Sequence, residues 1–174
     1  MGQAWGLGGC GGPEVQQLFN RPDPAPGRGE VLIRVDVAGV NLSATWCVRV
    51  WGRCLGGGRP FPRVLGMEAA GTVRRWGRTS TASRWVTRSS ASRSPAAAYV
   101  ETMVLSAPST ARIPADLYAP VAATLPIAGT TAVDVLDQLG LPAGATVLVN
   151  GVGGGVGLAV ARLAAGREQQ SSST

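Results

Sequence analysis

A glycine-rich turn between two apolar stretches constrains the fold of this chain more than any other sequence feature. Residues 145–166 read ATVLVNGVGGGVGLAVARLAAG. Val147 to Val149 form an apolar run that predicts a strand. After the glycines, Val156, Val160 and Leu163 have the spacing of a buried helix face, and Gly166 is expected to cap that helix. The segment therefore predicts a strand–turn–helix unit, which is how a dinucleotide-binding fold begins.

The glycines of this turn are candidates for contact with a cofactor pyrophosphate. Backbone N–H groups at a helix N-terminus attract phosphate, and side chains there would block its approach. The candidate residues are Gly151, Gly154, Gly155 and Gly157, with Val156 packing the turn. A strict GxGxxG frame is not met. A glycine-rich turn without a ligand is the alternative interpretation.

The rest of the chain contains both strand and helix patterns. Residues 31–37 alternate apolar and polar side chains, which predicts a strand, and residues 98–105 predict a second one. Residues 118–139 have helical periodicity, and Gly140 is placed to end that helix. The residues expected on its apolar face are Ala132, Val135, Leu136 and Leu139.

The charged residues exclude several kinds of site. The chain of 174 residues has no His, and all 16 of its basic residues are Arg, against 10 acidic residues. A catalytic triad or a zinc site that uses His therefore cannot form from this chain. A general acid or base would have to be a carboxyl group, Tyr, Cys or water.

Cysteine usage and hydropathy indicate a cytoplasmic protein. The three cysteines are Cys10, Cys47 and Cys54, without a CxxC pair, so we expect incidental thiols in a reducing compartment. The first residues lack the pattern of a signal peptide. No window reaches the ~18 uninterrupted apolar residues of a membrane span.

One window fits neither strand nor helix periodicity. Residues 73–94 contain six Arg, nine Ser or Thr and no acid. We expect this window to be irregular, or at most a strand pair, and its composition is typical of a solvated segment. A less favoured alternative is an Arg-rich nucleic-acid binder, in which Trp76 and Trp85 would stack on bases.

Six short motifs occur in an order that resembles a known family. They are GGPEV, PDPAPGRGEVLIRV, AGVN, PFPRVLGMEAAGTV, LPIAGTTA and TVLVNGVGGGVGLAVARLA. Together they resemble the medium-chain dehydrogenase/reductase superfamily, and within it the zinc-independent branch of quinone oxidoreductases and enoyl reductases. The resemblance covers residues 11–72 and 97–166.

The resemblance implies an α/β fold. Residues 1–120 would form a β-rich GroES-like domain. Residues 121–174 would form a connecting helix and the first βα unit of a truncated Rossmann domain. The implied activity is hydride transfer from NADPH, with NADH as an alternative, to a small-molecule quinone or enone. No membrane or nucleic-acid partner is expected, and a homodimer is expected only of a full-length relative.

The resemblance also implies which residues line the nicotinamide pocket. Asn41 and Thr130 match positions near the nicotinamide, and are the candidate catalytic residues. The alternatives are an ordinary Asn in a strand-exit turn and a helix N-cap Thr. Where the zinc-using branch places Cys and His ligands, this chain has Asn41 and Met67. The resemblance therefore implies no metal.

Two departures from the family pattern predict weak or absent activity. The residue that reads the cofactor ribose is expected about 20 residues past the glycine motif, beyond Thr174. The family has barrel strands where this chain has residues 73–94, and a change of reading frame would explain that window and the tail after Arg167. The alternative to an enzyme is a non-catalytic remnant that associates with an intact relative.

Overall fold

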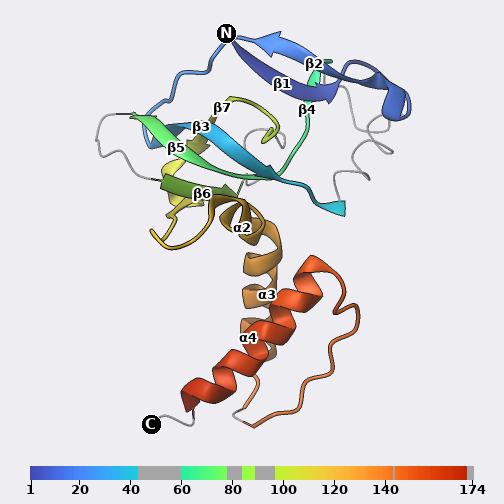
Figure 1. Cartoon of the computed structure of the whole chain (residues 1–174), viewed down its shortest axis with the longest axis vertical. Coiled ribbons are helices and arrows are strands. Elements are labelled where there is room, and N and C mark those ends of the chain that lie inside the picture. Colours follow the sequence, from blue (N-terminus) through green and yellow to red (C-terminus); the bar gives the residue numbers. More distant parts are fainter. Residues whose placement is uncertain (43–59, 78–83, 89–96, 143, 172–174) are drawn as a thin grey trace. The chain divides into compact units, whose positions relative to one another are not determined.

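The computed structural model describes residues 1–42, 60–77, 84–88, 97–142 and 144–171. The chain divides into two compact units, Met1–Thr124 and Leu125–Thr174. The first unit contains the two sheets, and the second contains the long helices α3 and α4 (Figure 1). This content confirms the predicted α/β fold class. The assignment of residues 1–120 and 121–174 to particular domain types stays a prediction.

A three-stranded antiparallel sheet forms near the N-terminus of the first unit. Its order is β2 (Gln16–Arg21), β1 (Gly2–Leu7) and β4 (Arg63–Val64), and a short 3-10 turn at Pro13–Val15 precedes β2. Along β1, buried and exposed residues alternate over the first four positions, as expected for a strand with one face in a core.

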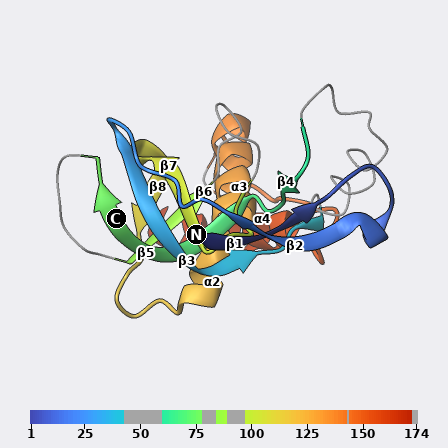
Figure 2. The ribbon, with the colours of Figure 1, turned by 90° about the horizontal axis from the view of Figure 1, so that it is seen from above.

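The second sheet has five strands in the order β7, β3, β5, β6, β8, all antiparallel to their neighbours. Their bounds are Thr102–Ser106, Glu30–Gly39, Glu68–Trp76, Arg84–Arg88 and Thr110–Arg112. β3 runs beside β5 at the centre (Figure 2). Its buried side chains Val31 and Ile33 pack with Ala69, Met103 and Leu105. The strand predicted at 31–37 is therefore confirmed, and β7 covers the second half of the one predicted at 98–105.

The Arg/Ser-rich window is not irregular throughout, which corrects the first expectation for it. Val73–Trp76 forms the end of β5, and Arg84–Arg88 forms β6, which pairs with both β5 and β8. The window therefore contributes parts of two strands, but these parts do not pair with each other: Val73–Trp76 pairs with β3, and β6 pairs with Glu68–Thr72 of β5. Strand pairing uses backbone N–H and C=O groups, so neighbouring strands can hold a segment that has no hydrophobic period of its own. Residues 78–83 and 89–94 lie outside the described residues.

The second unit is built on two helices, α3 (Leu125–Leu139) and α4 (Gly155–Ser171), which pack against each other. Buried Ala132 and Leu136 of α3 meet buried Val160 of α4. The predicted helix at 118–139 is interrupted at Thr124, and its first part is α2 (Ala119–Ala123), which belongs to the first unit. Gly140 has φ +55° and ends α3, as predicted.

Several details of the helix and strand predictions in this unit are wrong. Val147 to Val149 do not form a strand, because none of the described residues of the unit forms a strand beside them. α4 continues through Gly166 to Ser171, so Gly166 is not its cap. The α3–α4 contact buries only a narrow strip, and the expected core residues outside it are exposed; these are Val135, Leu139, Val156 and Leu163.

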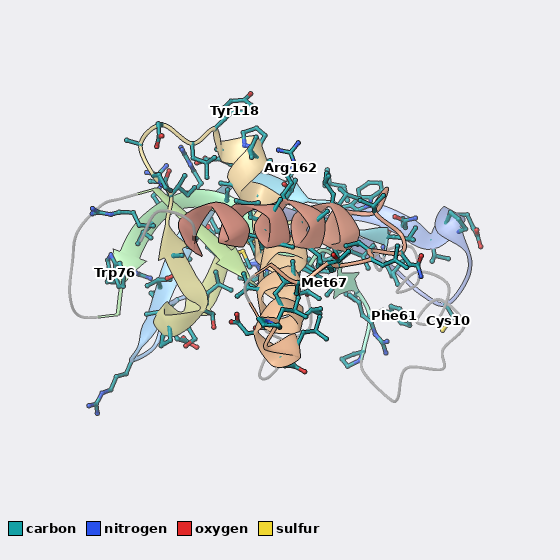
Figure 3. The ribbon with its side chains drawn as sticks, turned by 90° about the horizontal axis from the view of Figure 1, so that it is seen from below. Cys10, Phe61, Met67, Trp76, Tyr118 and Arg162 are labelled. Carbon is teal, nitrogen blue, oxygen red and sulfur yellow. The ribbon has the colours of Figure 1, made fainter. Side chains whose placement is uncertain are left out.

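Cysteine pairing differs from the expectation. Cys10, labelled in Figure 3, takes part in a disulfide bond, whereas three incidental thiols were expected. An odd number of cysteines does not exclude one bond. Cys47 and Cys54 lie outside the described residues. Among the helices of the described chain, none is long and apolar enough to cross a membrane.

Candidate functional site

Asn41 lies directly after β3, and its side chain is bound to a buried carboxylate. Asn41 Nδ2 donates a hydrogen bond of 2.6 Å to Glu68 Oε1. Glu68 begins β5 and is paired with Gly39 in the β3–β5 ladder, which is why the two side chains meet across the sheet. Asn41 itself is half-buried, so part of its side chain is accessible. The structure thus confirms a strand-exit position for Asn41, which leaves a pocket role open.

Glu68 is a feature of this site that the sequence analysis missed. It is 2% exposed and is the sole charged side chain buried within the described parts of the chain. A carboxylate is costly to bury unless hydrogen bonds compensate it, and the Asn41 amide supplies one. The available signal was a single acid inside the small, apolar run Met67–Gly71.

Gly39 provides the space that Glu68 occupies. A Cβ at Gly39 would lie 2.5 Å from Glu68 Oε1 and 2.6 Å from the carbonyl oxygen of Ala123. No side chain larger than that of Gly fits there without displacing the carboxylate or the α2 backbone. The Tyr99 hydroxyl donates to the Gly39 carbonyl at 3.4 Å, which further holds this strand end in place.

Met67, labelled in Figure 3, precedes Glu68 in the chain and is the position at which the resemblance implies a ligand in the zinc-using branch. Within the described ranges, no group of three or more His, Cys, Asp or Glu side chains could hold a metal ion. The absence of a metal from this protein stays a prediction.

The glycine turn leads directly into α4, as predicted. Gly151 has φ +75°, a left-handed conformation that favours glycine. The N–H of Gly154 donates to the Gly151 carbonyl at 2.9 Å, and the N–H of Leu158 donates to the Gly154 carbonyl at 2.9 Å. The first of these bonds closes the turn and the second begins the helical ladder, so the turn ends at a helix N-terminus.

The local fold explains some of these glycines and not others. A Cβ at Gly157 would collide with the Gly151 carbonyl group, whose carbon would lie 2.8 Å away. At Gly153 a Cβ would meet nothing within 4 Å, and at Gly154 only the Gly151 oxygen at 3.4 Å. At Gly155 it would make an ordinary contact of 3.5 Å with Ala128. The turn therefore requires glycine at 151 and 157, but packing does not require it at 153–155.

Val156, expected to pack the turn, is 36% exposed, and its packing against the turn stays a prediction. The first turn of α4 leaves this side chain outside the α3–α4 core. An approaching group at Gly153–Gly155 would therefore meet backbone and an exposed valine rather than a closed core. This open backbone fits a pyrophosphate held by N–H groups.

Thr130 lies inside α3, not at its N-terminus. Its hydroxyl donates to the carbonyl of Pro126, at 2.5 Å, and the residue is exposed. The N-cap alternative is therefore wrong, because a threonine within a helix bonds back to the carbonyl four residues earlier. Thr130 and the glycine turn belong to the second unit, and Asn41 belongs to the first. A role for Thr130 near a cofactor stays a prediction.

Comparison with protein families gives an assignment for the first unit. Residues 27–89 match the alcohol dehydrogenase GroES-like domain. This range includes β3, β5 and β6, and also Asn41 and Glu68. No curated protein sequence matches the chain.

Solved structures extend the assignment beyond that domain. A human synaptic vesicle membrane protein VAT-1 homolog-like protein is 30% identical, with a TM-score of 0.81 over 95% of this chain and 53% of its own. A mycobacterial protein complexed with NADPH is 33% identical, with a TM-score of 0.79 over 95% and 49%. A Pseudomonas syringae quinone oxidoreductase is 27% identical, with a TM-score of 0.78 over 94% and 50%.

These comparisons confirm the predicted resemblance to the medium-chain dehydrogenase/reductase superfamily. Within it, the structural relatives include quinone oxidoreductases. The chain spans about half the length of the solved structures to which it is similar.

Proposed function

We propose that this chain is an NADPH-using, zinc-independent oxidoreductase of the quinone or enone reductase type, with NADH as the alternative cofactor. The observation that carries the proposal is the run Gly153–Gly155. These glycines are needed neither for packing nor for a left-handed backbone, yet they lie at the N-terminus of α4. A ligand that approaches the backbone closely accounts for them. The NADPH complex of a structural relative supports the same ligand.

Different residues of this chain would bind different parts of the cofactor. Backbone N–H groups of Gly153 and of Gly155–Gly157 would hold the pyrophosphate, helped by the dipole of α4, whereas the Gly154 N–H closes the turn onto the Gly151 carbonyl. Gly151 would supply the left-handed turn that directs those groups outward. Asn41 and Thr130 would be polar residues near the nicotinamide. The bound cofactor would supply the hydride for a quinone or an enone.

We further propose that the 174-residue chain has weak or no turnover by itself, in a cytoplasmic setting. A dinucleotide binds at the carboxyl ends of several parallel strands. Among the described residues of the second unit there is no strand. The glycine turn would therefore contact the pyrophosphate without a crevice for the adenine. NADPH oxidation followed at its absorbance maximum should show no quinone-dependent rate, and a saturable rate would refute the proposal.

A second candidate is a non-catalytic remnant that associates with an intact relative. The exposed apolar side chains of the second unit favour it, with Leu148 at 87% exposure. The two candidates differ in whether the chain itself binds NADPH. Co-purification with an intact quinone oxidoreductase, without NADPH binding by the chain, would favour the remnant.

An NADPH titration with glycine variants tests the primary proposal. Cofactor fluorescence should change saturably with the purified chain, and Gly154→Val should abolish that change, because its side chain blocks the backbone. Gly166→Val is the matched control, since it lies in the same helix and a Cβ there meets nothing within 4 Å. Unchanged binding by Gly154→Val would remove the phosphate role. Equal loss in Gly166→Val would show that helix stability caused the effect.

A further inference from the structure

The hydrogen bond between Asn41 and Glu68 determines which polar atom Asn41 can offer to a ligand. A side-chain amide has one acceptor oxygen and one donor nitrogen, and an ionised carboxylate can only accept. The nitrogen, Nδ2, is the atom directed at Glu68 Oε1, at 2.6 Å. The carbonyl oxygen Oδ1 is therefore not the atom directed at Glu68. With Asn41 half-buried at the end of β3, that oxygen can act as an acceptor.

The carboxylate is itself held in place on several sides. Glu68 is 2% exposed, and its backbone is in the β3–β5 ladder opposite Gly39. Its Oε1 lies so close to Gly39 that no Cβ fits between them. A rotation of the Asn41 amide would place Oδ1 against the carboxylate, with two acceptors in contact. Burial strengthens that penalty, because water does not screen it.

We infer that Glu68 is a positioning residue that fixes the Asn41 amide, so that Asn41 presents Oδ1 as an acceptor for an N–H or O–H donor of a bound ligand. Under the proposed function, on which the ligand's identity rests, that donor is the carboxamide NH₂ of the nicotinamide. Asn41 would then orient the cofactor, whereas a developing enolate oxygen, which needs a donor, would be stabilised by other groups.

The first part of the test observes the Asn41 amide in the ligand-free chain. The chain has two other asparagines, Asn20 and Asn150, and both are exposed, so they serve as internal references in a ¹⁵N spectrum. One Asn41 Nδ2 proton should lie well downfield of theirs because of its short bond to a carboxylate. Glu68→Gln should move it toward the reference signals. The exposed carboxylate variant Glu101→Gln should leave it in place.

Gly39→Ala provides a second variant that keeps the carboxylate. Its Cβ would displace Glu68 from Asn41, so the same downfield proton should move. Gly9→Ala is the control, because a Cβ there meets nothing within 4 Å. An Asn41 signal that does not change in either Glu68→Gln or Gly39→Ala would overturn the inference.

The second part measures which cofactor group Asn41 recognises. The probes are NADPH and its reduced 3-acetylpyridine analogue, which has a methyl ketone in place of the carboxamide and so lacks the NH₂ donor. The full chain should bind NADPH about 5- to 10-fold more tightly, as expected for one hydrogen bond. In Glu68→Gln the ratio of the two dissociation constants should fall to about 1 or 2, because either amide orientation is then allowed.

The outcomes separate this inference from the proposed function. A ratio that is the same in the wild type and in Glu68→Gln, with the Asn41 signal moved, would overturn the acceptor role. A general loss of stability would weaken both cofactors equally and leave the ratio unchanged. If neither cofactor binds the wild type, the proposed function fails, and the Asn41 signal alone then decides whether Glu68 positions the amide.

Discussion

Glycines in and after the turn before α4 are expected to differ in how much their substitution changes the free energy of unfolding. Gly157 lies where a Cβ would collide with the Gly151 carbonyl group. Gly157→Ala should therefore destabilise the second unit by about 1–3 kcal/mol, the usual cost of overpacking. Gly166→Ala, in open space on the same helix, should be stabilising by about 0.5–1 kcal/mol. Urea denaturation followed by helical circular dichroism measures both. Equal stability of the two variants would contradict the close approach at Gly157.

Asp23 should make stability depend on acidic pH. Hydrogen bonds from the Met1 ammonium group, 2.8 Å from Oδ2, and from the Thr102 hydroxyl, 2.9 Å from Oδ1, lower the pKa of this carboxyl group. A carboxyl whose pKa is lowered by folding stabilises the fold above its unfolded pKa of about 3.9. That stability is lost as the pH falls through the folded-state pKa.

Asp23→Asn removes this titration and tests it. The melting temperature of the wild type should exceed that of the variant at pH 7, and the difference should shrink as the pH is lowered below about 4. The effect is small, because the pair is at the surface. A difference that is constant or that widens in acid would show that Asp23 does not act through its charge.

At the scale of residues, the sequence identified candidate site residues, but it did not identify the side chains that they contact. Asn41 could be nominated from its motif, but its contact with Glu68 depends on the β3–β5 register across a separation of 27 residues. Local patterns carry no information on such a register. The Gly153–Gly155 run was visible in the sequence. Its independence from local packing could be seen only in the structure.

At the scale of elements, the α3–α4 pair depends on a narrow core. Leu136 is 1% exposed and packs in the cluster with Ala132 and Val160, whereas Leu139, on the same helix, is 56% exposed. Leu136→Ala should cost about 2–5 kcal/mol, and Leu139→Ala should stay within about 0.5 kcal/mol. Thermal unfolding monitored at the α-helical signal distinguishes them. Comparable losses in both variants would mean that α3 packs differently.

We predict that residues 147–149, between these helices, promote self-association of the chain. Val147 to Val149 combine high strand propensity with backbone that belongs to no strand, and Leu148 is 87% exposed. Leu148→Lys should raise the concentration at which the chain stays monodisperse in light scattering, without changing its melting temperature. If the variant aggregates as the wild type does, this segment is not the cause.

A strand was predicted correctly where the sequence had a hydrophobic alternation and the fold also supplied neighbouring strands for it to pair with. β3 has alternating residues and two neighbouring strands, and it formed as predicted. Residues 147–149 have the apolar pattern of a strand, but the described part of the unit supplies no strand to pair with them. β6 is the reverse case, since its sequence has no period and its position is set by β5 and β8. Tertiary context decided both outcomes.

At the scale of the whole molecule, the two units carry different parts of the proposed function. The first unit matches the alcohol dehydrogenase GroES-like domain over residues 27–89 and presents Asn41, held by Glu68. The second unit presents the glycine turn at the N-terminus of α4. The superfamily was recognisable from six motifs in order, because each unit keeps its own local signature even though the chain spans about half of its structural relatives.

The central claim is that the turn before α4 holds a cofactor pyrophosphate. The most direct measurement is the set of backbone amide shifts in a ¹⁵N spectrum of the full chain as NADPH is added. We predict that the largest and saturable shifts occur at Gly153 to Gly157, and that inorganic pyrophosphate competes for the same amides. Shifts that are absent there, or that centre on another part of the chain, would contradict the account.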